Sequence, residues 1–209
     1  NEGETRNNKI KHYNYSKEYI IWSVEKSIKD LKTDYLDLLL LHRPSPLMHP
    51  DEIAAAISEL KEQGKILDFG VSNFTPSQVN LINSKTPISV NQIEFSLTQH
   101  TAMHNGTLDQ ILQQEILPMS WSPLGTYFKE QNEANTRIKK VLDNLTKKYN
   151  ATEDQVLLAW ILKHPSKVSP VIGTTNKTRI ENAVKALKID LELEDWFTML
   201  VEYQGHKIP

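Results

Sequence analysis

The sequence predicts an α/β fold, and within that class a (β/α)8 TIM barrel of which this chain carries about the last five β/α units and a C-terminal helix. Short apolar segments alternate with longer segments of helical periodicity, which is typical of a parallel sheet. No G-x-G-x-x-G turn follows a strand, although a dinucleotide-binding doubly wound sheet would usually carry one. Polar residues instead follow strand after strand, and a barrel places its functional groups at that rim.

In the first quarter of the chain, a helical pattern is followed by a continuous apolar run. Residues 16–31 carry apolar residues at helical spacing behind Ser16, the expected N-cap. Residues 35–41 are almost entirely apolar, as in a strand that is buried on both faces of a parallel sheet. Residues 50–64 share an apolar face again, and Gly64 is expected to form the C-cap of this helix.

The same alternation continues through the middle of the chain. Residues 66–71 predict a strand, and Thr75 and Pro76 then supply the cap and the first-turn proline of another helix. Residues 88–95 predict the next strand and residues 107–114 a short helix.

The last part of the chain adds two more strands and four helices. Thr152 is followed three residues later by Gln155, which is the signature of a capping box. No linker or low-complexity run interrupts the order, so residues 1–209 are expected to form a single domain. The predicted strands are residues 118–121 and 169–172, and the predicted helices are residues 132–149, 152–164, 176–187 and 193–203.

Composition and charge exclude several classes of protein. Hydrophobic residues make up 39% and charged residues 24% of the chain, which is close to average soluble usage. The formal net charge of −2 provides no broad basic surface, so nucleic acid and anionic membranes are not expected as partners. No apolar stretch approaches the roughly 20 residues that cross a bilayer. The absence of cysteine excludes disulfides and thiolate chemistry. We therefore expect a cytoplasmic protein.

Each polar residue at a strand end also has an ordinary structural interpretation. A histidine after an apolar run, such as His42, is often a hydrogen-bonded structural residue. Asn73 can cap the following helix, and Gln92 can be an outward-facing strand residue. Gly173 can simply form part of a turn that leads into a helix, and Arg179 can be a solvated residue of that helix.

Taken together, these residues indicate a nicotinamide dinucleotide site. Asn73 and Gln92 carry amides, which can both donate to and accept from a carboxamide. Trp121 offers a flat aromatic face to a ring. Arg179 lies in the first turn of a predicted helix, where free N–H groups and a guanidinium suit a phosphate. Barrels often bind phosphate on the loops after their last strands.

The chain resembles the aldo-keto reductase family, in particular bacterial oxidoreductases whose strand motif reads HRP. The resemblance covers nearly the whole chain. The matching segments are highly specific when they are taken together, although no single segment is. The resemblance implies a TIM barrel that reduces aldehyde or ketone carbonyls of small molecules by hydride transfer from NADPH. The segments that carry it are DYLDLLLLHRP, GKILDFGVSNF, ISVNQIEFS, LPMSWSPLG and PVIGTTNKTRIENAV.

The resemblance also implies a role for individual residues. His42 is the active-site histidine, which helps to orient or polarise the substrate carbonyl. Three groups of residues hold NADP(H): those at the nicotinamide carboxamide and ring, those at the pyrophosphate, and those at the adenosine 2′-phosphate. They are respectively Ser72, Asn73, Gln92 and Trp121; Ser122, Leu124 and Gly125; and Gly173, Thr174, Thr175, Arg179 and Asn182.

The sequence departs from the family pattern ahead of His42. The family's acid is a tyrosine, assisted by a lysine and an aspartate, on strands that precede the histidine strand. Residues 1–34 offer Tyr13, Tyr15 and Lys17, which are chemically suitable but lie in a different segment. We therefore expect the N-terminal part of the barrel to be absent from this chain, and residues 1–209 alone to be inactive as a reductase.

Two other functions are compatible with parts of this pattern. A non-catalytic, cofactor-binding regulatory protein of the same fold is the main alternative, because fold alone does not define activity. An isomerase or aldolase barrel would need a carboxylate or a Schiff-base lysine at a strand end, and none of the predicted ends has one. His100 and His104 have a spacing that can bind metal on a helix, but no third ligand follows, so no metal site is expected.

Overall fold

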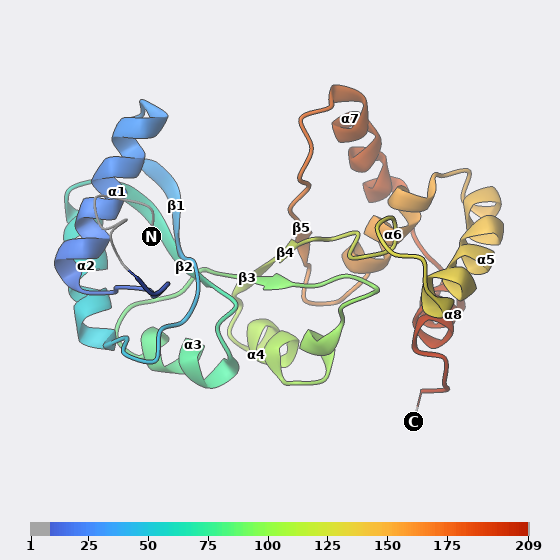
Figure 1. Ribbon diagram of the computed structural model, residues 1–209, viewed down its shortest axis with the longest axis horizontal. Coiled ribbons are helices and arrows are strands. Elements are labelled where there is room, and N and C mark those ends of the chain that lie inside the picture. Colours follow the sequence, from blue (N-terminus) through green and yellow to red (C-terminus); the bar gives the residue numbers. More distant parts are fainter. Residues whose placement is uncertain (1–8, 209) are drawn as a thin grey trace. The chain divides into compact units, whose positions relative to one another are not determined.

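The computed structural model describes residues 9–208, in two compact units (Figure 1). The first, here called the N-terminal unit, extends to Gln92 and includes Gln114–Ile116. The second, the C-terminal unit, comprises Ile93–Gln113 and the chain from Leu117 onward. Strand β3 (Val90–Glu94) passes from the first unit into the second. The expectation that residues 1–209 form a single domain stays a prediction.

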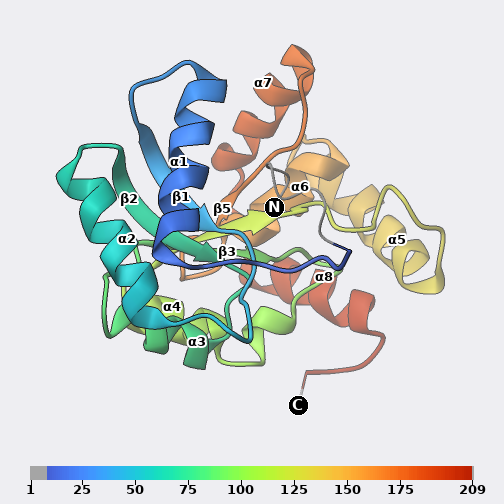
Figure 2. The ribbon, with the colours of Figure 1, turned by 60° about the vertical axis from the view of Figure 1, so that its left-hand side comes forward.

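The N-terminal unit alternates helices and parallel strands as predicted. Its strands lie in the order β1, β2, β3, with Leu41 opposite Val71 and Ser72 opposite Gln92. Helix α2 packs against α1 and against α3, and the views in Figures 1 and 2 show these helices beside the strands. The elements are α1 (Lys17–Leu31), β1 (Leu36–Leu41), α2 (Pro50–Glu62), β2 (Ile66–Ser72), α3 (Pro76–Asn83) and β3.

Local capping chemistry sets the helix boundaries. The Ser16 hydroxyl accepts a hydrogen bond from the backbone N–H of Tyr19, so the predicted N-cap of α1 is confirmed. Thr75 and Gln78 form a reciprocal capping box at the start of α3. The C-cap of α2 is Gln63 rather than Gly64, which follows it in the left-handed region with φ +67°. Gly64 therefore turns the chain after the cap.

The leucines of β1 are less buried than the sequence predicts. Leu41 is buried, whereas Leu38, Leu39 and Leu40 are half-buried. The expectation of a strand buried on both faces was therefore wrong for most of β1 in this chain. Within residues 9–208, β1 is at one end of the strand order and pairs with β2 alone, so its side chains have neighbours on one side only.

The core of the N-terminal unit lies between its strands and helices. Gly70 brings β2 and β3 close together, because a Cβ at this position would stand 2.5 Å from the Val90 carbonyl oxygen. The largest buried side chains come from α2, β2 and α3 and from the turn between β2 and α3, namely Ile53, Ile57, Leu60, Ile66, Phe69, Phe74 and Ile82. This packing holds the carboxyl ends of the three strands in register.

The C-terminal unit also contains parallel strands with helices packed beside them. Its strand order is β3, β4, β5, with Met119 opposite Ser169 and Ser120 opposite Pro170. In this unit α5 packs against α6 and α8, and α6 packs against α7. The elements are the 3-10 turn η1 (Thr101–Met103), α4 (Thr107–Gln113), β4 (Leu117–Trp121), α5 (Glu133–Lys148), α6 (Glu153–Leu162), β5 (Ser169–Pro170), α7 (Lys177–Lys185), η2 (Ala186–Lys188) and α8 (Leu193–Gln204).

The last strand is shorter than predicted. The sequence predicts residues 169–172, but β5 contains only Ser169–Pro170. Pro170 has no N–H to donate, and one further backbone bond, from the Val171 N–H to the Ser120 carbonyl at 2.8 Å, ends the pairing. Residues 172–176 then belong to no strand or helix before α7 begins.

The core of the C-terminal unit is built around Trp160, which is fully buried in α6. Its ring stacks on Trp196 of α8 with centroids 4.8 Å apart and an interplanar angle of 4°. Each indole N–H donates to the backbone carbonyl of the other tryptophan, at 3.1 and 2.9 Å. Helices α6 and α8 are thus joined by both packing and hydrogen bonds. In the described part of the chain, no helix is long and apolar enough to cross a bilayer.

Candidate active site

The first half of the predicted site lies at the carboxyl ends of β1, β2 and β3. Leu41 and Val71 are paired, so His42 and Ser72 leave neighbouring strands at the same level. Ser72 is in turn opposite Gln92. Parallel strands present their carboxyl ends at one edge, and the N-terminal unit therefore brings these predicted residues together.

Hydrogen bonds among these residues fix the turn after β2. The Gln92 carbonyl accepts from the Ser72 hydroxyl at 3.0 Å and from the Asn73 backbone N–H at 2.9 Å. The Asn73 side-chain amide donates to the Ser72 hydroxyl at 2.8 Å. Asn73 has φ +59°, a conformation that asparagine tolerates better than most residues. The half-buried Gln92 side chain forms no hydrogen bond with residues 9–208, so its amide is available to a ligand.

Asn91 supports this turn from the opposite side of β3. Its side chain is fully buried, and its amide donates to the Phe74 carbonyl at 3.1 Å. Successive strand residues face opposite ways, so Asn91 points away from the side to which Gln92 points. Sequence reasoning missed this residue. The signal available was two adjacent amides within the short strand VNQIE.

His42 is exposed just beyond β1. The pKa of its imidazole is lowered, first by partial burial and then by the positive charges of Arg43 and Lys11. The Tyr13 ring meets the imidazole edge to face, with centroids 5.9 Å apart. A lowered pKa favours the neutral imidazole near neutral pH, and a neutral imidazole can both donate and accept hydrogen bonds.

The second half of the predicted site lies at the carboxyl ends of β4 and β5, within the C-terminal unit. Trp121 ends β4 and is half-buried, and Ser122 follows with φ +50°. The Gly125 N–H donates to the Ser122 carbonyl at 2.8 Å, which closes a tight turn that contains Leu124. The residues SPLG therefore form a turn, and Gly125 has φ +54°, a conformation that glycine permits.

Gly125 is required by both its backbone and its surroundings. It has φ +54°, and a Cβ there would stand 1.9 Å from the Thr98 Oγ1 atom and 2.6 Å from the Ser96 Oγ atom. We predict that Gly125→Ala lowers the free energy of unfolding by about 2 kcal/mol or more, since the left-handed conformation alone costs about 1–2 kcal/mol. Urea unfolding provides the measurement. Gly106→Ala is the control, because Gly106 has φ +80° but open space around it. Equal losses for the two variants would show that the contact with Thr98 is unimportant.

The segment after β5 leads into the N-terminus of α7. The Asn176 side chain accepts from the Arg179 backbone N–H at 3.1 Å, and the Thr174 hydroxyl accepts from the Asn176 N–H at 3.2 Å. Asn176 is thus the N-cap of α7. Gly173 and Thr175 are exposed.

Two further side chains of α7 belong to the predicted phosphate end. Arg179 is exposed, and its guanidinium forms no ion pair with residues 9–208. Asn182 accepts a hydrogen bond from Lys185 Nζ at 2.8 Å through its side chain, and its carbonyl accepts from Gln155 at 3.0 Å. Arg179 is therefore available to a ligand, whereas the Asn182 side chain already has a partner.

No metal site accompanies these residues in the part of the chain that the structure describes. Within residues 9–208, no group of three His, Asp or Glu side chains could hold an ion. His100 uses both ring nitrogens, one facing the Leu97 carbonyl at 2.9 Å and the other facing the Gln204 amide at 3.1 Å. The neighbouring His104 packs against it with ring centroids 5.7 Å apart. The pair thus has a structural role beside α8.

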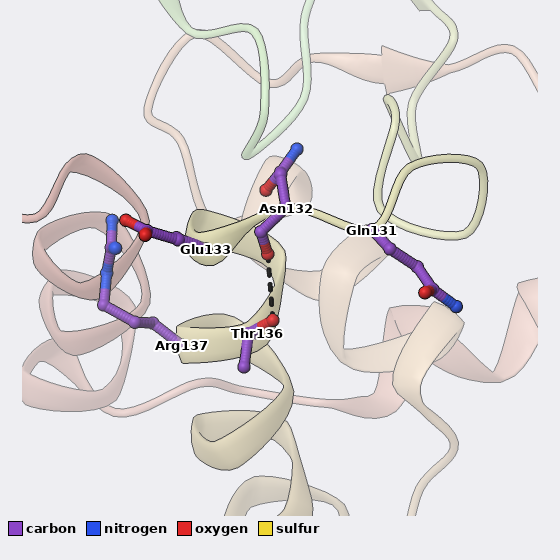
Figure 3. A pocket seen from close by; sticks show the side chains of 5 residues that line it. All are labelled: Gln131, Asn132, Glu133, Thr136 and Arg137. Carbon is purple, nitrogen blue, oxygen red and sulfur yellow. Dashed lines mark hydrogen bonds between the residues drawn. The ribbon is translucent and has the colours of Figure 1, made fainter.

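Two surface hollows lie outside the predicted cofactor residues. One, of about 580 Å³, surrounds the first turn of α5 and contains Asn132, Thr136 and Arg137 (Figure 3). Its polar groups serve the fold: Thr136 donates to the Asn132 carbonyl at 2.9 Å, and Arg137 donates to the Glu202 and Tyr203 carbonyls at the end of α8. The other, of about 320 Å³, is lined by residues of segment 12–16 together with Leu47, His49 and Glu52.

Comparison with known proteins identifies the family. Residues 6–199 match the Aldo/keto reductase family. An uncharacterized oxidoreductase, YcsN, from Bacillus subtilis (strain 168) is 40% identical over 203 residues, which are 95% of this chain and 68% of the relative. A 6-dehydroglucose reductase from Agrobacterium fabrum is 36% identical over 204 residues, which are 96% of this chain and 68% of the relative.

A solved structure agrees with the sequence comparison. The crystal structure of the thermostable aldo-keto reductase Tm1743 in complex with the inhibitor epalrestat superimposes with a TM-score of 0.82 and 27% identity. The superposition covers 90% of this chain and 67% of that one. The chain therefore belongs to the aldo/keto reductase family of oxidoreductases, and the predicted α/β class with a parallel barrel sheet is confirmed.

Proposed function

We propose that the protein is an NADPH-dependent reductase of small aldehydes or ketones. The observation that carries the proposal is that His42, Ser72, Asn73 and Gln92 stand at the carboxyl ends of three successive parallel strands, with the Gln92 amide unengaged. Membership of an oxidoreductase family supports it. The name of the relative from Agrobacterium further suggests a sugar-derived carbonyl as a substrate to test.

Each predicted group of residues suits one part of the cofactor by its chemistry. Ser72, Asn73 and Gln92 suit the carboxamide, because their turn holds amide and hydroxyl groups rigidly at one edge. Trp121 suits the nicotinamide ring. The remaining residues suit the phosphates: Ser122, Leu124 and Gly125 at the pyrophosphate, and Gly173, Thr174, Thr175, Arg179 and Asn182 at the 2′-phosphate.

His42 would act on the substrate rather than on the cofactor. When bound, the reduced nicotinamide supplies the hydride that the carbonyl carbon receives. As negative charge develops on the carbonyl oxygen, a hydrogen bond from the neutral His42 imidazole would stabilise it. Because His42 stands just beyond β1, its side chain can face the substrate while the turn after β2 holds the carboxamide.

Arg179 provides the test of cofactor preference. We expect Arg179→Ala to weaken NADPH binding by about 1–3 kcal/mol, through loss of a charged hydrogen bond to the 2′-phosphate, and to leave NADH binding nearly unchanged. Fluorescence titration with each dinucleotide measures both affinities.

The control for Arg179→Ala is Lys188→Ala, which removes the same charge from an exposed position in η2. It should affect neither cofactor. Equal losses of NADPH and NADH affinity in Arg179→Ala would disprove the assignment of the 2′-phosphate site. Tight NADPH binding by the full-length wild type without turnover of any aldehyde or ketone would instead support the non-catalytic alternative.

A further inference from the structure

Two tyrosines that precede α1 in the sequence contact the chain at the end of β1. The Tyr15 hydroxyl donates a hydrogen bond to the Arg43 carbonyl, and the Arg43 backbone N–H donates to the Tyr15 oxygen at 3.2 Å. One phenol therefore engages both backbone groups of the residue that follows His42. Burial raises the pKa of Tyr15 to about 12, so the hydroxyl keeps its proton at physiological pH and remains a donor.

Tyr13 connects this hydrogen-bonded phenol to the imidazole. Its ring stacks on Tyr15 with centroids 6.3 Å apart and an interplanar angle of 16°. It meets the His42 ring edge to face, with centroids 5.9 Å apart and an interplanar angle of 88°. The three rings form a continuous series, and offset or perpendicular aromatic pairs of this kind are attractive beyond the area they bury.

The chain around His42 has little regular structure to hold it. Strand β1 ends at Leu41, and residues 42–46 belong to no helix or strand. Pro44 follows Arg43 and offers no N–H, so the hydrogen bonds at Arg43 come immediately before a residue that cannot donate one. A contact that fixes the Arg43 backbone also restricts the backbone on which the His42 side chain depends.

We propose that Tyr13 and Tyr15, here called the aromatic clamp, are positioning residues for His42. Tyr15 holds the backbone beyond the strand end, and Tyr13 sets the plane of the imidazole. The inference rests on the proposed reductase function for its catalytic consequence. A near-ideal orientation matters because a misplacement of about 1 Å can cost roughly 100-fold in rate.

The clamp also borders accessible space. Tyr13 and Tyr15 line the hollow of about 320 Å³ together with Leu47, which is 93% exposed, and His49. Both tyrosines are half-buried, with one part of each ring toward the strand end and another toward this hollow. A residue pair that only filled the core would have no such exposed side.

A set of variants tests Tyr13 and Tyr15 one at a time, and distinguishes the hydrogen bonds of the Tyr15 hydroxyl from the ring contact of Tyr13. Tyr15→Phe removes the hydroxyl alone, Tyr13→Leu removes the ring, and Tyr13→Phe restores the ring without the hydroxyl. Tyr35→Phe, at an exposed position before β1, is the matched control. In the purified enzyme, Tyr15→Phe and Tyr13→Leu should each lower kcat roughly tenfold and change the NADPH dissociation constant by less than about twofold. Tyr13→Phe should rescue most of the turnover lost in Tyr13→Leu.

A second measurement does not depend on cofactor or activity. The His42 ring proton signals, followed by NMR against pH, report the imidazole pKa and the shielding by the Tyr13 ring. In Tyr13→Leu we expect the signals to move and the pKa to rise toward its ordinary value, because partial burial is the first cause that lowers it. Arg43 and Lys11 lower the same pKa and are unchanged in the variant.

The outcomes distinguish this inference from the proposed function. If the full-length wild type neither binds NADPH nor reduces a carbonyl, the proposed function fails, while the NMR titration still tests whether the clamp holds His42. If the wild type is active but Tyr15→Phe and Tyr13→Leu match it in kcat and in the His42 titration, the clamp is overturned. A parallel loss of turnover, NADPH affinity and thermal stability without rescue by Tyr13→Phe would also overturn it, in favour of a purely structural role.

Discussion

Replacing His42 with Asn in the full-length enzyme should lower turnover at least about 100-fold, because a positioned imidazole typically contributes about 10²–10⁴-fold when it acts on a reacting group. NADPH affinity should remain close to that of the wild type. His42 leaves the end of β1, whereas the polar groups assigned to the carboxamide belong to the turn after β2 and to β3. Loss of the imidazole therefore removes an interaction with the transition state and leaves the cofactor contacts in place.

Steady-state kinetics with a reactive aldehyde, together with fluorescence titration of NADPH, measure both quantities. His206→Asn is the matched control, since this exposed histidine contacts only the neighbouring Lys207 carbonyl among the described residues. Normal turnover in His42→Asn, or loss of the folded state, would support the ordinary structural interpretation of a histidine after an apolar run.

Replacing Trp160 with Ala should produce the largest loss of stability, about 3–5 kcal/mol, as is typical when a buried tryptophan is truncated. Trp160 is fully buried. Its ring packs against Trp196 and against Phe95, whose ring centroid is 5.6 Å away. The substitution removes the ring and its donor, and it leaves the Trp196 carbonyl without the 3.1 Å bond from the indole. Chemical unfolding followed by circular dichroism provides the free energy.

Trp160→Phe separates packing from hydrogen bonding in the same position. It keeps an aromatic ring on Trp196 but removes the N–H, so we expect a loss of about 1–3 kcal/mol. If Trp160→Ala were no more destabilising than Trp160→Phe, the stacked pair would contribute little, and the hydrogen bond would account for the joining of α6 and α8.

Local signals in the sequence predict most of the secondary structure, because local chemistry sets those boundaries. Ser16 caps α1, Thr75 caps α3, and Thr152 forms a capping box with Gln155 at the start of α6, as predicted. Apart from the C-cap of α2, which is Gln63 rather than Gly64, the failures concern strands. The leucines before His42 have too few neighbours to be buried within this chain, and the last strand ends early at Pro170. Burial and pairing depend on other strands, which a local pattern does not contain.

The candidate site shows the same division between local and distant causes. The strand-end positions of Ser72 and Gln92 follow from the alternating pattern, and the register places them side by side. The contact between Tyr15 and Arg43 joins residues 28 positions apart, and no periodicity predicts it. Asn91 was missed because an amide in a strand gives no sign of which buried carbonyl it will meet.

The double hydrogen bond at position 92 has a consequence for engineering the enzyme. The acceptor is the main-chain oxygen, which every amino acid possesses, so the loop after β2 does not depend on the glutamine side chain for its shape. At residue 92 the backbone carbonyl therefore holds the loop, whereas the side chain is left to bind the cofactor. Position 92 is a suitable place to diversify the side chain in a search for altered or synthetic cofactors, because the loop that would receive them is held by the backbone.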